Sequence, residues 1–276
     1  MADVQARGVR FHVQRVAART ATAAAPAPAP TAVHVHGLAV DNLTGMYLTL
    51  AGPLAAAGVA SVLYDQRGHG LSERPPTGYT LADSVADLHA LLDALDVTGP
   101  VQLIGNSYGG AVALGYALAH PQRVARLALI EGHLPVPGWG ERMAASLAGL
   151  GDDRHVGPLL REAAEIAPGL EATLSRRAGR LTGSTTLVPD LAATPPFTDD
   201  RLCALSCPVL ALYGGRSDVL HYGRHLAATV PDCELRVLPD CGHFLLADAG
   251  PQVTALLVDR LRPEPALAGT VPGKPE

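Results

Sequence analysis

Six short apolar runs, separated by stretches with helical periodicity, dominate the chain from residue 32 onward. They lie at residues 32–35, 59–64, 101–104, 127–130, 209–213 and 235–238. None alternates between apolar and polar residues, which is typical of strands buried on both faces. Because the segments between the early runs are long enough for crossover helices, the pattern predicts an α/β fold with a doubly wound, mostly parallel sheet. An alternating segment before them, Val9–Val16, predicts an edge strand with one solvent-exposed face.

A long interruption separates two of these runs. About 75 residues lie between Glu131 and Cys207, and a structureless loop of that length is uncommon in a compact domain. Helical stretches at 141–150, 158–181 and 185–191 therefore predict a helical insertion over one end of the sheet. The predicted organisation follows from this interruption. It places a first core segment at 1–131, a helical cap at 132–200, a second core segment at 201–262 and a flexible tail at 263–276.

The composition excludes several classes of protein. With 48% hydrophobic residues and a mean hydropathy of +0.19, the chain has enough apolar material for a large core and does not resemble a disordered protein. The net charge of -5 argues against nucleic acid and anionic membrane surfaces as partners. A run of alternating Ala and Pro at 21–30 cannot supply ladder hydrogen bonds and predicts an extended surface spacer.

No membrane segment is expected. The longest uncharged run, 42–64, contains Gly52, Pro53 and Gly58, and it divides better into a helix at 47–57 and a buried strand at 59–64. No secretory signal is visible before the Ala/Pro run. The four cysteines are too few and too clustered to be a disulfide framework, so a reduced, cytoplasmic setting is expected. They are Cys203, Cys207, Cys233 and Cys241.

The strongest chemical signal is Gly-Asn-Ser-Tyr-Gly at residues 105–109. It fits the pattern G-x-S-x-G and lies between an apolar strand and a helical pattern at 111–119. A serine on such a sharp turn has strained backbone angles and needs neighbours without a Cβ atom. The turn would point the Ser107 hydroxyl away from the sheet, in front of the positive end of a helix. We therefore predict that Ser107 is a nucleophile.

A serine nucleophile needs a base that is held in place by an acid. Asp218 follows the strand at 209–213 and His243 follows the strand at 235–238, so the chain order Ser, acid, His is satisfied. Both residues leave the carboxyl ends of parallel strands, at the edge where Ser107 emerges. The sequence thus predicts a triad of Ser107, His243 and Asp218.

In these motifs the chain resembles the α/β-hydrolase family. The resemblance extends from His36-Gly37 through Asp-Gln-Arg-Gly-His-Gly-Leu-Ser at 65–72 and the Ser107 turn to Asp218 and Gly242-His243. It implies an eight-stranded sheet with a helical cap after the sixth strand. It also implies an oxyanion hole formed by the backbone N–H groups of Leu38 and Tyr108. Some members of the family take their acid from the strand before the cap, which makes Glu131 the competitor of Asp218.

Other polar residues are assigned mainly structural roles. His36 is expected to shape the oxyanion loop, His69 to stabilise loops beside the site, and His34 to be a core residue. Asp65, in the Asp-x-Arg-Gly turn, is expected to form a structural ion pair. No metal or organic cofactor is expected. The residues predicted to line the substrate pocket are His36, Asn106, Glu131, His133, Trp139, Met143 and Phe244.

The predicted reaction is hydrolysis of an ester or thioester of a small, mostly apolar substrate through an acyl-enzyme. Two alternatives share the serine nucleophile. With Asn106 before the serine, the turn is similar to the Gly-Asn-Ser turn of meta-cleavage C–C bond hydrolases. However, this chain has Phe244 where those enzymes have Trp. A release thioesterase of secondary metabolism is equally open. The alternative of another class is a non-catalytic ligand receptor, and the oligomeric state and physiological substrate stay open.

Overall fold

The structure is a computed structural model, and it describes residues 2–19, 29–148 and 171–263. The predicted Ala/Pro spacer at 21–30 and the predicted tail at 263–276 lie largely outside these residues. So does the first part of the helix predicted at 158–181.

The described residues form one eight-stranded sheet with the order β1-β2-β4-β3-β5-β6-β7-β8. From β4 to β8 every neighbouring pair is parallel, while β1 and β2 run antiparallel to their neighbours. The predicted fold class, a doubly wound and mostly parallel sheet, is confirmed. The strands are β1 (Ala2–Ala6), β2 (Val9–Val16), β3 (Thr31–Val35), β4 (Ala60–Tyr64), β5 (Val101–Asn106), β6 (Val124–Ile130), β7 (Val209–Gly214) and β8 (Cys233–Leu238).

The edge of the sheet differs from the prediction. β2 is not an edge strand, because β1 pairs with its outer side from Ala2↔Val13 to Ala6↔Val9. A two-residue turn joins them, with Arg7 at φ 49° and Gly8 at φ 73°. Two positive φ angles are typical of the tight hairpin turn that matches strand twist. Arg is unusual at the first of these positions, so the turn is hard to recognise in the sequence.

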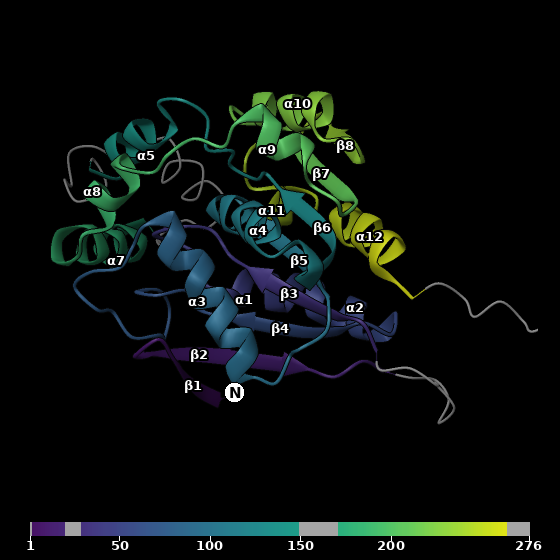
Figure 1. Cartoon of the computed structure of the whole chain (residues 1–276), viewed down its shortest axis with the longest axis horizontal. Coiled ribbons are helices and arrows are strands. Elements are labelled where there is room, and N and C mark those ends of the chain that lie inside the picture. Colours follow the sequence, from purple (N-terminus) through teal and green to yellow (C-terminus); the bar gives the residue numbers. More distant parts are fainter. Residues whose placement is uncertain (1, 20–28, 149–170, 264–276) are drawn as a thin grey trace, which may run out of the picture.

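Helices cover both faces of the sheet (Figure 1). On one face lie α3 (Leu81–Ala94), α4 (Tyr108–Ala119) and α10 (Leu220–Thr229), whose apolar residues share one core cluster. The other face is covered by a second cluster, to which residues of α1, η1, α2, α11 and α12 contribute. These elements are α1 (Leu43–Met46), the π-helical turn η1 (Tyr47–Ala51), α2 (Gly52–Ala56), α11 (Leu245–Asp248) and α12 (Gly250–Leu261). The uncharged run 42–64 is therefore a helical segment followed by β4, as predicted.

None of the helices in the described part of the chain is long and apolar enough to cross a bilayer.

The insertion after β6 is helical where the structure describes it. It contains α5 (Trp139–Ala148), α7 (Glu171–Ser184) and α8 (Leu187–Ala192), which group together at one side of the sheet (Figure 1). Its two ends meet, because the N–H of Phe197 donates to the carbonyl of Pro135 at 2.7 Å. The short η2 (Pro121–Arg123) precedes β6, and α9 (Asp199–Cys203) lies between the insertion and β7.

The Asp-x-Arg-Gly turn after β4 is held by a buried ion pair, but not by the one expected. The Asp65 carboxylate accepts backbone N–H groups of Leu43 at 2.9 Å and Leu71 at 2.8 Å, so its partners are peptide groups rather than a cation. Arg67 instead forms two bonds, at 2.7 and 2.8 Å, to Asp87 on α3. Arg7 reaches the same carboxylate at 2.8 Å.

Removal of the Asp87 carboxylate should destabilise the fold strongly. Its side chain is 4% exposed, and Asp87→Ala would leave the partly buried Arg67 guanidinium without its partner, at a cost of about 3 kcal/mol or more in unfolding free energy. The matched control is Asp93→Ala on the same helix, whose carboxylate is 54% exposed and pairs with Arg123. The control should cost less than about 1 kcal/mol. Urea unfolding measures both, and equal losses would contradict this account of the turn.

Candidate active site

Ser107 occupies the junction between β5 and α4. Its backbone angles, φ 53° and ψ -119°, lie outside the helical and extended regions. Added Cβ atoms at Gly105 and Gly109 would overlap backbone atoms of Gly109 and Val35, and one at Gly110 would come within 2.5 Å of the Gly132 Cα. The chain can therefore turn this sharply only because these positions are glycine. The N–H of Ser107 donates to the Ile130 carbonyl at 2.9 Å, which fixes the turn to the end of β6.

His243 faces the serine hydroxyl. It lies in the loop between β8 and α11, is 8% exposed, and places its Nε2 atom 3.0 Å from the Ser107 Oγ. These two predicted residues, 136 positions apart in the chain, are thus within hydrogen-bond distance. That distance suits transfer of the hydroxyl proton to an imidazole.

The carboxylate beside His243 is Glu131, not Asp218. Glu131 follows β6 directly, is fully buried, and places Oε2 at 3.1 Å from the His243 Nδ1. Its oxygens also accept the N–H of Gly214 and the hydroxyl of Ser217. Three donors around one side chain fit a carboxylate, which can only accept. The contact holds the proton on Nδ1 and leaves the Nε2 lone pair facing Ser107.

The predicted pairing of Asp218 with His243 is wrong in this structure. The Asp218 side chain is exposed, in the turn between β7 and α10, and its carbonyl accepts a bond from the His221 ring at 2.8 Å. β6 and β7 are parallel neighbours, so the segments that follow them, with Glu131 and Asp218, begin at the same edge of the sheet. The side chain immediately at the end of β6 points into the core, whereas the one four residues beyond β7 points to solvent.

Leu38 and Tyr108, whose N–H groups were predicted to be oxyanion donors, lie next in the chain to Gly37 and Ser107. Among the described residues, no acceptor is bonded to the backbone N–H of Leu38, and Tyr108 is the first residue of α4, whose N–H has no partner within the helix. Gly37 lies close to Ser107, since an added Cβ on it would be 3.4 Å from the serine Cβ. Two backbone donors near the serine, without an acceptor among the described residues, are suited to stabilising an oxyanion.

Two histidines hold the loop that carries Leu38. His36 is bonded to the Gly37 carbonyl at 2.7 Å and accepts the N–H of Gln66 at 3.0 Å. His69 accepts the N–H of Ala39 at 2.9 Å, and Ala39 has a strained φ of 63°. Burial, with a smaller effect of His36, lowers the pKa of His69 to about 3, so its ring stays a neutral acceptor. Both rings have the loop-shaping contacts that were predicted for them.

Asp41 and Ser217 were missed by sequence reasoning. Asp41 accepts the N–H of Gly37 at 2.7 Å and the side-chain amide of Asn106 at 3.2 Å, so it ties the oxyanion loop to the serine turn. The only signal was its position as the last charged residue before the uncharged run 42–64. Ser217 has no distinguishing pattern, and its contact with Glu131 becomes visible only in three dimensions.

A cavity of about 360 Å³ opens onto Ser107 and His243. Its walls are mainly apolar and include Leu38, Met46 and Phe244, with Asn106 and Asp41 as polar groups. Of the predicted pocket residues, the cavity therefore includes Asn106 and Phe244. The cavity lies toward α1 and α11 rather than toward α5.

The other predicted pocket residues do not line this cavity. Glu131 is fully buried beneath His243, and His36 is buried in the oxyanion loop. Trp139 is 1% exposed and stacks on Tyr108 with ring centroids 6.4 Å apart. Its indole N–H donates to His133 at 3.2 Å, and desolvation lowers the pKa of His133 to about 3. Met143 packs against the main core cluster.

No group of three or more His, Cys, Asp or Glu side chains that could hold a metal occurs among the described residues. All four cysteines are free.

Known proteins of one family resemble this chain. The sequence model of the alpha/beta hydrolase family matches residues 32–256. A 2-hydroxy-6-oxononadienedioate/2-hydroxy-6-oxononatrienedioate hydrolase of Paraburkholderia xenovorans is 30% identical over 230 residues, covering 76% of this chain and 78% of the relative.

Solved structures share the fold at lower identity. An esterase from Exiguobacterium antarcticum superposes with a TM-score of 0.76 at 20% identity, covering 95% of this chain and 99% of that one. A meta-cleavage product hydrolase from Pseudomonas fluorescens gives a TM-score of 0.67 at 20% identity, covering 94% and 96%.

Proposed function

The chain belongs to the alpha/beta hydrolase family, and we propose that it is a serine hydrolase whose triad is Ser107, His243 and Glu131. The observation that carries the proposal is the continuous contact from Ser107 Oγ to His243 Nε2 at 3.0 Å and from His243 Nδ1 to Glu131 Oε2 at 3.1 Å. A receptor on the same fold does not need this alignment of nucleophile, base and carboxylate.

The proposed reaction is acyl transfer to water. His243 takes the hydroxyl proton as Ser107 Oγ bonds to the carbonyl carbon of the substrate, and the developing oxyanion accepts from the Leu38 and Tyr108 N–H groups. The imidazolium, stabilised by Glu131, then gives its proton to the leaving group as the bond to that group breaks. A water molecule, deprotonated by His243, then attacks the acyl carbon. The bond to Ser107 Oγ breaks, His243 returns the proton to that oxygen, and the acid is released.

The cavity supports an ester or thioester of a small, mostly apolar acyl group as the substrate. Its volume of about 360 Å³ lies at the lower end of the range for small-molecule sites, and the side chains nearest the serine are apolar.

Hydrolysis of a C–C bond in a meta-cleavage product is the second candidate. It is favoured by the activity of the Paraburkholderia xenovorans relative and by Asn106 within the serine turn. The same nucleophile, base and oxyanion donors would act on a ketone carbonyl, with a carbon leaving group that must be protonated. Phe244 follows the histidine where the meta-cleavage hydrolases have Trp, and this difference favours ester hydrolysis. A release thioesterase is a special case of the first candidate.

A substrate panel separates these reactions. We expect the protein to hydrolyse 4-nitrophenyl esters and acyl thioesters of two to eight carbons at rates far above those of Ser107→Ala, with a 2-hydroxy-6-oxo dienoate as the C–C substrate in the same buffer. Turnover of the dienoate without turnover of any ester would instead assign C–C hydrolysis. No turnover of either class, with ligand binding retained, would contradict the enzymatic proposal.

A further inference from the structure

A second, larger cavity adjoins the one at Ser107. Its volume is about 510 Å³, and it shares Val40 and Asp41 with the cavity at the serine. It lies between the oxyanion loop, the Asp-x-Arg-Gly turn and α7. The walls of the two cavities therefore meet at Val40 and Asp41.

Three arginines line this second cavity: Arg74, Arg177 and Arg180. In the part of the chain that the structure describes, none of them has a carboxylate within ion-pair distance. The Nε atoms of Arg74 and Arg180 donate only to the carbonyls of Gly68 at 3.1 Å and Arg176 at 3.4 Å. Their terminal amino groups, and the whole Arg177 guanidinium, are thus available to a ligand.

The acidic groups of the cavity do not compensate these cations. Asp65 is buried and accepts two backbone N–H groups, from Leu43 and Leu71. Asp41 accepts the N–H of Gly37 and of Asn42, together with the Asn106 amide. Both carboxylates therefore already have donors from the protein. Three guanidinium groups against two such carboxylates leave a net positive charge.

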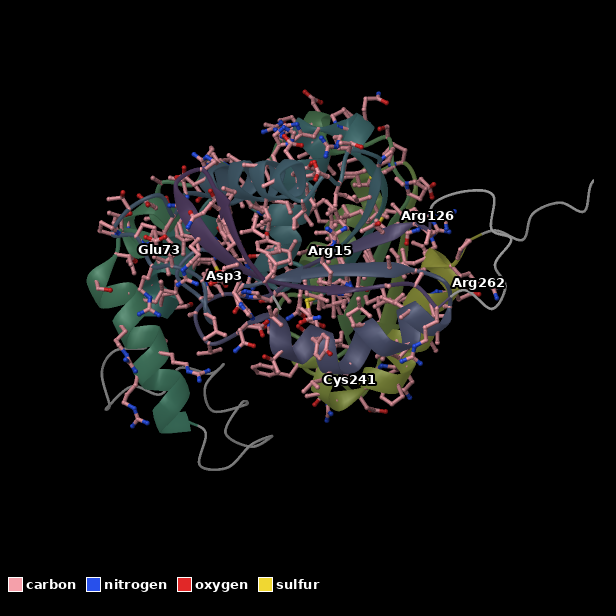
Figure 2. All side chains as sticks on the ribbon, turned by 90° about the horizontal axis from the view of Figure 1, so that it is seen from below. Asp3, Arg15, Glu73, Arg126, Cys241 and Arg262 are labelled. Carbon is pink, nitrogen blue, oxygen red and sulfur yellow. The ribbon has the colours of Figure 1, made fainter. Side chains whose placement is uncertain are left out.

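The position of α7 is fixed by packing. Leu181 is 1% exposed and lies against the turn at Gly68, where an added Cβ would come within 2.7 Å of its Cδ1 atom. The N–H of Thr186 donates to the Pro76 carbonyl at 2.9 Å. Figure 2 shows α7, in green, extending from the flank of the molecule on which Glu73 is labelled. Arg177 and Arg180 lie three residues apart, on neighbouring positions of this anchored helix.

We propose that this second cavity binds an anionic group, a carboxylate or a phosphate, at the end of the substrate remote from the bond that Ser107 attacks. Guanidinium groups pair with both anions through two parallel hydrogen bonds. The inference rests on the proposed hydrolase function and specifies its substrate class: an ester or thioester whose acyl chain carries a terminal negative charge.

Two esters that differ only in that charge test the proposal. One is 4-nitrophenyl hydrogen adipate and the other is its methyl ester, both followed by nitrophenolate release. The wild type should favour the anionic ester in kcat/KM, and 0.5 M NaCl should reduce the preference. Arg177→Gln/Arg180→Gln should lower the ratio of anionic to neutral kcat/KM by about tenfold or more. Arg176→Gln, on the same helix but outside the cavity lining, should leave the ratio unchanged.

A binding measurement separates failure of this inference from failure of the hydrolase proposal. Calorimetry on the Ser107→Ala protein with adipate, and separately with inorganic phosphate, needs no turnover, and the tighter anion identifies the carboxylate or phosphate source. The arginine double variant should weaken that binding about tenfold or more. Absence of binding, or equal affinity in the double variant, overturns the anion site even if esters are hydrolysed. If Ser107→Ala binds the anion but the wild type hydrolyses no ester, the result supports the anion site and overturns only the proposed reaction.

Discussion

The Glu131→Gln variant should lose about 10⁴-fold in kcat, as expected when the carboxylate that orients a catalytic histidine becomes an amide. The amide can still accept the Gly214 N–H, but its NH₂ group would face His243 Nδ1. The imidazole would then carry its proton on Nε2 and could not accept the Ser107 proton. Asp218→Asn, a change at an exposed side chain, should alter kcat by no more than roughly twofold.

Steady-state kinetics on one 4-nitrophenyl ester measure both variants, and thermal unfolding checks that each is folded. A loss confined to Asp218→Asn would return the acid to the loop after β7 and would contradict the geometry at Glu131.

Ser107→Ala should abolish turnover, with kcat lowered by about 10⁴-fold or more. This substitution removes a single oxygen atom from the cavity wall, so binding of the product acid should persist with a similar Kd. The matched control is Ser217→Ala, which removes one donor to Glu131 but leaves Gly214 and His243 in place. Its kcat should fall far less. Full activity of Ser107→Ala at the purity of the wild type would show that another residue is the nucleophile.

The buried strands and the serine turn could be predicted because each depends on local pattern. Strands buried on both faces need continuous apolar runs, and a serine between β5 and α4 needs Gly105 and Gly109. The hairpin of β1 and β2 could not be predicted, because Arg7-Gly8 is an uncommon turn sequence for two positive φ angles.

The choice between two carboxylates depends on which side chain turns inward. Glu131 and Asp218 both satisfy the chain order and both follow strands at the same sheet edge. What distinguishes them is the φ of 52° at Glu131, which aims its side chain at Gly214 and His243. The charge immediately after the buried apolar end of β6 was the available signal.

The predicted pocket was partly misplaced for a similar reason. Trp139 and Met143 were expected to face the substrate because both ends of the insertion leave the sheet at the edge where Ser107 emerges. In the structure Trp139 stacks on Tyr108 and donates a hydrogen bond to His133, and the cavity opens toward α1 and α11 instead. The packing partners of a large side chain are tertiary information that no periodicity contains.

The most direct test of the triad is the rate and site of labelling by a fluorophosphonate, followed by intact mass and peptide mapping. The wild type should gain one adduct, on Ser107. Labelling should slow at least about a hundredfold in Glu131→Gln and stay near the wild-type rate in Asp218→Asn. An adduct on another residue, or equal labelling rates in wild type and Glu131→Gln, would contradict the assignment of Ser107, His243 and Glu131.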